Sequence, residues 1–213
     1  MTTLRTIAIL RGYRPEVACH LAQRAWNAGF DLVEIPVQDE AGWQALEAVA
    51  ELSRSGFLGA GTVLAPSEVV RARQLGCAVT ISPGLDQELV TAAFEQGVTP
   101  LPGVLTPTEV MAAVRLGVHT VKLFPASLGG SRYLHALRAP FPDLGFVAVG
   151  GVDADNAFRF VESGAAGVAF GSSLEDVLAR GDCREFVSAL HDALERHWNQ
   201  TSCRADQPSN SGP

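Results

Sequence analysis

The stretch TEVMAAVRLGVHTVKLFP, residues 108–125, contains the pattern that recurs along the whole chain. Residues 108–116 carry apolar side chains at helical spacing and are followed by Gly117, a residue type that readily adopts the left-handed conformation at a helix C-terminus. Residues 120–124 are mostly apolar, have the length of a buried strand and are followed by Pro125. The stretch therefore predicts a helix and a strand joined by a glycine turn.

Similar units of strand and helix lie on both sides of this stretch. The predicted strands are residues 6–10, 32–36, 57–60, 78–81, 98–101, 120–124, 146–149 and 167–170. The predicted helices are residues 16–28, a segment ending near 55, 67–75, 86–96, 108–116, 132–138, 155–163 and about 175–198.

Eight alternating units in about 200 residues favour one α/β domain, a single-domain (β/α)8 TIM barrel formed by residues 1–200. An open, doubly wound sheet is the alternative, although no G-x-G-x-x-G motif follows the first strand. Residues 201–213 are polar and aperiodic, so we expect a disordered tail.

The composition excludes several classes of protein. The 213 residues are 47% hydrophobic, which indicates a globular chain with a large core. A net charge of -7 without a basic cluster argues against nucleic acid or an anionic membrane as a main partner. The N-terminus lacks the pattern of a signal peptide, and the chain has no apolar run long enough for a membrane span.

The cysteines and histidines give no sign of a metal site. Four cysteines are scattered without a C-x-x-C pair, which favours free thiols in a reducing cytoplasm over a metal site or a disulfide framework. The five histidines show no metal-ligand spacing, and His191 and His197 on the last predicted helix are expected to be solvated. We therefore expect a cytoplasmic protein without a metal ion or cofactor.

The barrel prediction turns the strand ends into a list of candidate site residues, because barrel enzymes place their active sites at the carboxyl ends of the strands. Reading along the chain, these candidates are Arg11-Gly12, Glu34, Gly61-Thr62, Ser82-Pro83-Gly84, Pro102-Gly103, Lys122, Gly150-Gly151 and Gly171-Ser172.

Lys122 and Glu34 are the charges best placed within apolar strands. Desolvation lowers the pKa of a lysine amine, which can then attack a ketone to form a Schiff base. A nearby carboxylate can transfer protons directly or through a water molecule. The structural alternatives are a salt bridge across the barrel interior and a lysine whose amine reaches solvent from the strand end.

Two glycine-containing loops late in the chain are candidates for phosphate binding. Gly150-Gly151 and Gly171-Ser172 follow consecutive strands, where barrels frequently bind phosphate with loop amides. A tight turn is the alternative for Gly150-Gly151. Elsewhere at the strand ends, Thr62 offers a hydroxyl group, and Arg11 can either pair with a substrate carboxylate or remain a surface side chain.

Seven motifs together resemble the 2-keto-3-deoxy-6-phosphogluconate and -galactonate aldolases. The resemblance runs in collinear order from about residue 7 to residue 178. The motifs are IAILRG (7–12), VEIP (33–36), GAGTV (59–63), ISPG (81–84), KLFP (122–125), VGGV (149–152) and Gly171-Ser172.

The resemblance implies a class I aldolase with a barrel fold and without a metal ion, and it suggests a homotrimer. It implies that Lys122 forms the Schiff base and that Glu34 acts through water as acid and base. The resemblance also implies that Thr62 binds the pyruvate carboxylate and that Pro83 and Phe124 line the pocket. It implies that the phosphate is bound by Gly150, Gly151, Gly171 and Ser172.

Three positions bear on the substrate. The gluconate enzymes carry an arginine four residues after the catalytic glutamate and a threonine before the Gly-Gly pair, where this chain has Gln38 and Val149. Arg11 is similar to the galactonate branch and can supply the missing positive charge. We therefore favour cleavage of 2-dehydro-3-deoxy-6-phosphogalactonate to pyruvate and glyceraldehyde 3-phosphate.

The sequence is also compatible with other functions. The gluconate epimer, or both epimers, are alternative substrates. A different phosphate-binding barrel enzyme, such as an isomerase, would share the late glycine loops without needing Lys122. A barrel that only binds a phosphorylated ligand would need neither Lys122 nor Glu34.

Overall fold

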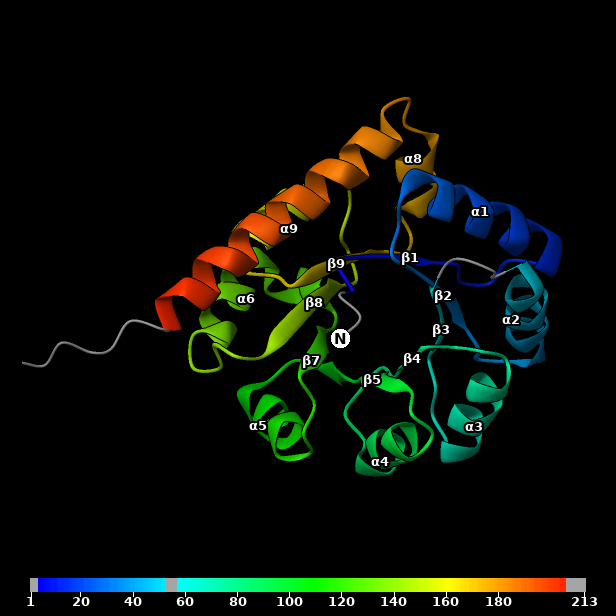
Figure 1. Ribbon diagram of the computed structural model, residues 1–213, viewed down its shortest axis with the longest axis horizontal. Coiled ribbons are helices and arrows are strands. Elements are labelled where there is room, and N and C mark those ends of the chain that lie inside the picture. The colour runs from blue at the N-terminus through cyan, green and yellow to red at the C-terminus, as the bar shows by residue number, and fades with distance from the viewer. Residues whose placement is uncertain (1–3, 53–56, 206–213) are drawn as a thin grey trace, which may run out of the picture.

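The computed structural model describes residues 4–52 and 57–205, with side chains described as far as residue 196. The described strands are β1 (Thr6–Ile9), β2 (Leu32–Pro36), β3 (Phe57–Gly61), β4 (Val79–Ile81), β5 (Thr99–Leu101), β6 (Gly103–Val104), β7 (Thr120–Leu123), β8 (Gly145–Val149) and β9 (Gly167–Phe170). The helices are α1 (Pro15–Ala28), α2 (Glu40–Leu52), α3 (Pro66–Gln74), α4 (Gln87–Glu95), α5 (Pro107–Arg115), α6 (Gly130–Arg138), α7 (Ala157–Glu162), α8 (Leu174–Ala179), α9 (Cys183–Ala205) and the short 3-10 helix η1 (Ala126–Leu128). Figure 1 shows the strands as an inner ring surrounded by the helices.

The strands form one parallel sheet in the order β5-β4-β3-β2-β1-β9-β8-β7-β6. Only Pro102 separates β5 from β6 along the chain. On one side of this junction Gly103 N donates to Ser82 O (3.1 Å), and on the other Lys122 N donates to Pro102 O (2.9 Å). β5 and β6 therefore act as one strand that is interrupted at a proline, and the predicted barrel is confirmed with that strand extended beyond residue 101.

The stretch around Gly117 folds as its sequence predicts, with bounds shifted by one residue. Pro107 begins α5, and Thr106 and Glu109 form a reciprocal cap, in which Glu109 Oε2 accepts from Thr106 N (2.7 Å) and Thr106 Oγ1 accepts from Glu109 N (3.4 Å). Gly117 follows the helix with a φ of 78°, a value that a side chain would strain. The chain then enters β7.

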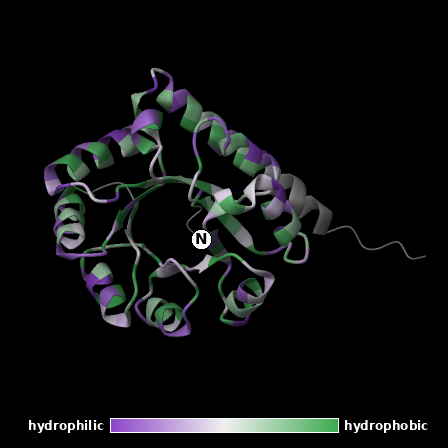
Figure 2. Cartoon of the chain, turned by 180° about the vertical axis from the view of Figure 1, so that it is seen from behind, coloured by the Kyte–Doolittle hydropathy of each residue, from purple (hydrophilic) through white to green (hydrophobic). Residues whose placement is uncertain are grey.

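Two apolar layers hold the barrel together. The interior is filled by a cluster that includes Ile7, Ile9, Leu32, Val79, Ile81, Leu101, Val147, Val149 and Ala169. A larger cluster fills the space between the strands and the surrounding helices. Figure 2 shows hydrophobic colouring along the strands, while the hydrophilic segments lie mainly on the helices and loops. The interior positions of the strands are therefore mostly apolar, and a charged side chain among them is unusual.

The C-terminal region differs from its prediction. The single helix expected over residues 175–198 is divided into α8 and α9. Arg180 interrupts it with an extended backbone (φ -62°, ψ 136°), and its guanidinium binds the Asp182 carboxylate through two hydrogen bonds of 2.9 Å. α9 continues to Ala205 and so includes the first residues of the predicted tail, whereas residues 206–213 lie outside the described part.

His191 was expected to be solvated, and the structure shows instead that it joins α9 to the barrel. Its Nε2 lies 2.8 Å from Thr6 Oγ1 and 3.3 Å from Asp31 Oδ2. Asp31 Oδ2 also accepts hydrogen bonds from the backbone amides of Arg5 (3.0 Å) and Thr6 (2.9 Å). The side chain of His197 lies outside the described residues. None of the helices in the described segments has the length and apolar character needed to cross a lipid bilayer.

Candidate active site

Lys122 lies in the middle of β7, and its side chain is on the interior side of the barrel. It pairs with Val147 of β8, which belongs to the interior cluster, and with Gly103 of β6. The residue is only 3% exposed, and Nζ lies 4.5 Å from the centre of the Phe124 ring. Burial lowers the pKa of the Lys122 amine, the nearby Glu34 opposes that shift, and Arg11 adds to it.

Glu34 occupies the equivalent interior position on β2. It pairs with Ile9 of the interior cluster and with Gly59, and it is 1% exposed. Burial raises the pKa of the Glu34 carboxyl, and the positive charges of Lys122 and Arg11 only partly oppose the rise. Its Oε1 has no hydrogen-bond partner among the described residues. A buried carboxyl without a partner is costly for the fold and available to a substrate or water.

Glycine on β3 makes room for this carboxyl. A methyl group added at Gly61 would lie 2.0 Å from Glu34 Oε1 and 2.7 Å from both Cδ and Cγ of the same side chain. The carboxyl group of Glu34 therefore occupies the space in which any larger residue would place its Cβ. The position of Glu34 depends on the absence of a side chain on the neighbouring strand.

Lys122 and Glu34 do not form the salt bridge that would explain them as a structural pair. The ion pairs found among the described side chains are surface pairs and the contact between His191 and Asp31. Lys122 and Glu34 still influence each other, because each opposes the effect of burial on the other. An amine with a lowered pKa in the same interior as a carboxyl with a raised pKa is suited to nucleophilic attack and proton transfer. The buried amine also rules out a side chain that reaches solvent.

Arg11, Gln38 and Thr62 meet at the mouth of the barrel, the end at which the strands have their carboxyl ends. The Arg11 guanidinium donates a short hydrogen bond to Gln38 Oε1 and a longer one to Thr62 Oγ1 (3.4 Å). Thr62 has a φ of 59°, a strained backbone for a β-branched residue. The structure thus brings together three predicted site residues from three strand ends.

The remaining predicted pocket residues lie on both sides of Lys122. Val149 is 4% exposed and belongs to the interior cluster, while Phe124 is half-buried and packs against that cluster. Pro83 is exposed and lies against the β5–β6 junction, where a methyl group on Gly103 would come within 2.1 Å of Pro83 O. Phe124 and Pro83 thus border the mouth, and Val149 lines the interior below it.

The loops after β8 and β9 adjoin each other, because these strands are neighbours in the sheet. Gly150 and Gly151 have φ values of 92° and 77°. A methyl group on Gly150 would contact the Phe124 ring at 3.2 Å, and one on Gly151 would meet Ser127 Cβ at 2.6 Å. Gly150-Gly151 is therefore a tight turn that also lies beside Phe124, the residue whose ring is next to Lys122.

Comparisons with known proteins agree with this geometry. A family model described as "KDPG and KHG aldolase" matches residues 1–187. The chain belongs to the KDPG and KHG aldolase family. It is similar to the 2-dehydro-3-deoxy-6-phosphogalactonate aldolase of Escherichia coli K12, with 37% identity over 81% of this chain and 85% of the relative.

Two solved structures extend the likeness to the fold. A structure described as native KDPGal has 33% identity and a TM-score of 0.76, over 95% of this chain and 98% of the other. The KDPG aldolase of Legionella pneumophila, with pyruvate captured as a covalent carbinolamine intermediate, has 25% identity and a TM-score of 0.75 over 93% and 94%.

Residues that the sequence analysis did not single out also lie around the glycine loops of this aldolase. Asn156 Nδ2 donates to Gly151 O (2.9 Å), and Ser173 Oγ donates to Val152 O (2.6 Å). Ser172, the predicted phosphate residue, is exposed beside Ser173. The D-x-x-N spacing of Asp153 and Asn156 is a turn signal that could have directed attention to this loop.

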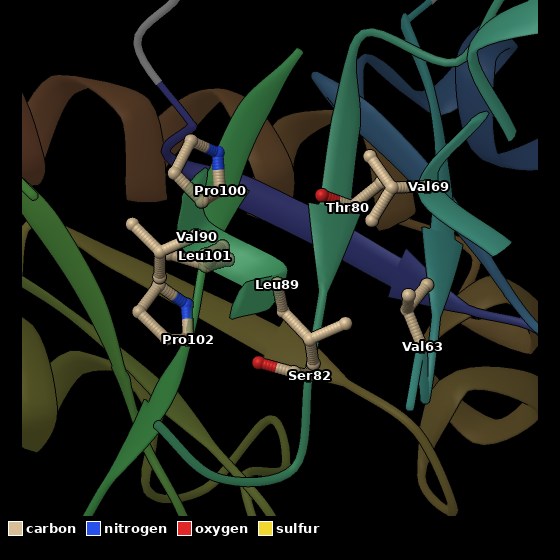
Figure 3. Close-up of a pocket in the computed structure, with 9 residues that line it drawn as sticks. All are labelled: Val63, Val69, Thr80, Ser82, Leu89, Val90, Pro100, Leu101 and Pro102. Atoms are coloured by element: carbon tan, nitrogen blue, oxygen red, sulfur yellow. The ribbon is translucent and has the colours of Figure 1, made fainter. Parts of the chain in front are cut away.

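A small pocket of the aldolase is lined by Ser82 and Pro102, two of the residues predicted at strand ends. It lies between β4, β5 and helices α3 and α4 (Figure 3), and it includes neither Lys122 nor Glu34. Its lining residues are Val63, Val69, Thr80, Ser82, Leu89, Val90, Pro100, Leu101 and Pro102. It has room for about one water molecule. Within residues 4–52 and 57–196, His, Cys, Asp and Glu side chains form no group that could hold a metal ion.

Proposed function

We propose that this aldolase cleaves 2-dehydro-3-deoxy-6-phosphogalactonate to pyruvate and D-glyceraldehyde 3-phosphate through a Schiff base on Lys122. The observation that carries the proposal is a buried lysine whose pKa is lowered by burial and which forms no ion pair with the described side chains. It shares the barrel interior with the buried Glu34, whose Oε1 has no hydrogen-bond partner within the described part of the chain. The kinship with a phosphogalactonate aldolase supports the choice of substrate.

The reaction follows from these two side chains. The neutral Lys122 amine attacks the C2 ketone, and loss of water from the carbinolamine gives a protonated Schiff base. Glu34, directly or through a water molecule, takes the proton of the C4 hydroxyl as the C3–C4 bond breaks. The bonding electrons move into the Schiff base and leave an enamine, while the aldehyde departs. Protonation at C3 and hydrolysis then release pyruvate and restore Lys122.

The mouth of the barrel supplies the charges that hold the substrate. In this proposal Arg11, supported by Gln38, and the hydroxyl of Thr62 bind the pyruvate carboxylate. The amides of Gly150, Gly151 and Gly171 and the hydroxyl of Ser172 bind the phosphate, while Phe124 and Pro83 enclose the reacting carbon chain. The adjacency of β8 and β9 supports a single phosphate site.

The gluconate epimer is the second candidate substrate. Val149 favours the galactonate epimer, because an apolar side chain at this interior position cannot hydrogen-bond a hydroxyl group. The two substrates differ in configuration at C4, so kcat/KM measured with each one decides between them. A higher kcat/KM for the gluconate epimer would overturn the assignment of substrate while leaving the aldolase mechanism intact.

Borohydride trapping tests the mechanism. Reduction in the presence of pyruvate should give a stable adduct on the peptide that contains Lys122, and mass analysis should locate it on that residue. Lys122→Ala should lose both the adduct and turnover, whereas Lys122→Arg should keep the charge and still lose both. An adduct at another lysine, or full turnover in Lys122→Ala, would refute the proposed nucleophile.

We also propose that the aldolase is a cytoplasmic homotrimer. Free thiols at Cys19, Cys77 and Cys183 support a reducing compartment. Apolar side chains exposed next to the mouth support self-association, because Leu64 is 65% exposed and Leu128 71% exposed. Light scattering coupled to size exclusion should give about three times the mass of one chain, and a monomer at high concentration would contradict the trimer.

A further inference from the structure

Three consecutive carbonyl groups after β8 each accept a hydrogen bond from a different part of the chain. The donors are Ser127 N to Gly150 O (3.0 Å), Asn156 Nδ2 to Gly151 O (2.9 Å) and Ser173 Oγ to Val152 O (2.6 Å). These donors come from η1, from the residue before α7 and from the residue before α8. The loop is therefore held from three directions.

Fixing these carbonyls also fixes the amide groups that follow them. In a trans peptide the C=O of one residue and the N–H of the next point in opposite directions. The amide of Asp153 is occupied, because it donates to Asn156 Oδ1 (3.1 Å). Among the described residues the amides of Gly151 and Val152 donate to no protein group. Two consecutive backbone donors are thus oriented and left free, which is the arrangement of an anion-binding nest.

Asn156 is itself held in place. Its side chain uses both ends of the amide, since Nδ2 donates to Gly151 O and Oδ1 accepts from Asp153 N. Its backbone amide donates to Asp153 Oδ1 (2.9 Å). These contacts close a small ring across the loop, so rotation of the Asn156 side chain would break two hydrogen bonds at once.

Ser173 connects the two glycine loops. It lies next to Ser172 after β9, and its hydroxyl donates a hydrogen bond to Val152 O on the loop after β8. Phe124 lies against Gly150 on the opposite side, at 3.2 Å from the position of an added Cβ. The loop after β8 is therefore held between Phe124, whose ring is next to Lys122, and the loop that follows β9.

We propose that Asn156 and Ser173 are positioning residues for phosphate recognition, which hold the amides of Gly151 and Val152 toward the substrate phosphate without touching it themselves. The inference rests on the proposed phosphorylated substrate. Donors that are already oriented bind an anion without the cost of ordering the loop, and their loss should weaken only the phosphate contact.

The experiment compares two substrates and one partial reaction. Asn156→Ala and Ser173→Ala should each raise KM for the phosphorylated sugar acid by about 10-fold, the effect of one lost hydrogen bond to a charged group. KM for the same sugar acid without phosphate should change by less than about 2-fold, and so should the exchange of pyruvate methyl protons in D2O. Ser173→Thr keeps the hydroxyl and should restore KM. Asp155→Ala is the matched control, since its exposed side chain makes no hydrogen bond among the described residues.

The outcomes separate this inference from the proposed function. If both variants weaken the two substrates and pyruvate exchange equally, their role is structural and the inference is wrong. If the unaltered protein has the same KM for the sugar acid with and without phosphate, the phosphate site and this inference are wrong, whereas the aldolase mechanism is unaffected. Absence of pyruvate exchange in the unaltered protein would refute the mechanism itself.

Discussion

Replacing Gly61 by alanine tests how strictly the fold fixes the Glu34 carboxyl, the acid and base of the proposed reaction. The new Cβ would lie 2.0 Å from Glu34 Oε1 and 2.7 Å from Cδ and Cγ. Non-bonded heavy atoms need about 3.5 Å, so the carboxyl group must move by roughly 1 Å or more. A displacement of about 1 Å in a reacting group can cost about 100-fold in rate, which corresponds to about 2.7 kcal/mol of barrier.

The assay is kcat for aldol cleavage, followed through the release of pyruvate. We expect Gly61→Ala to lower kcat by about 100-fold. Because the proposed function places the substrate contacts mainly at the mouth of the barrel, KM should change by less than about 3-fold. Gly181→Ala is the control for the glycine substitution itself, since a methyl group there meets no atom within 4 Å.

A double-mutant cycle with Glu34→Gln decides whether Gly61 acts through the carboxyl. If it does, Gly61→Ala should cost less than about 3-fold when Glu34 has already been replaced by glutamine. An equal 100-fold loss in both backgrounds would show that Gly61 acts by another route. Unchanged kcat in the single variant would refute the claim that the position of this carboxyl limits the rate.

Three further variants test the electrostatics and the substrate choice. Glu34→Gln should stabilise the fold at neutral pH by about 1 kcal/mol, because it removes a buried carboxyl group whose ionisation burial opposes, and urea unfolding would show it. Because its pKa is raised, Glu34 keeps a proton in the folded protein that it releases in the unfolded chain. The free energy of unfolding of the native protein should therefore fall as pH rises from the ordinary glutamate pKa to the raised one. A free energy of unfolding that does not change with pH over this range would contradict that shift. Asp31→Asn should cost about 1 kcal/mol at pH 7. Burial raises the pKa of Asp31, but hydrogen bonds from His191 and from the amides of Thr6 and Arg5 lower it overall. The stabilisation by Asp31 should therefore be lost as pH falls through the lowered pKa. If Asp31→Asn shifted the unfolding midpoint equally at pH 3 and pH 7, this reasoning would be wrong. Val149→Thr should raise kcat/KM for the gluconate epimer relative to the galactonate epimer by about 10-fold, and an unchanged ratio would exclude Val149 as a determinant.

The barrel was predictable because its signals are local. Six of the eight predicted helices end at a glycine, and each strand is a short apolar segment, so the eight units can be identified without knowing how they pack. The parallel barrel then follows from the alternation of strands and helices. The division between α8 and α9 was not predicted, because one helix was assigned over residues 175–198, within which Arg180 adopts an extended conformation.

The candidate site was predictable in its residue types and not in its contacts. Lys122 and Glu34 stood out because a charge in an apolar strand is rare. Because barrel enzymes place their active sites at the carboxyl ends of the strands, Arg11, Thr62 and the glycine loops were also predicted as site residues. The sequence could not show that Arg11 binds both Gln38 and Thr62, since those contacts join strand ends that lie 27 and 51 residues away along the chain.

The alternation of strands and helices, the family and the residue types suited to the chemistry all follow from the sequence, because each of them is recorded in local patterns. The contacts became visible in the folded chain: Gly61 makes room for Glu34, Lys122 and Glu34 form no salt bridge with each other, and Asn156 and Ser173 hold the loop after β8. Periodicity fixes which face of a strand a side chain takes, whereas the atoms that the side chain contacts depend on the register of neighbouring strands and on loops far away in the chain.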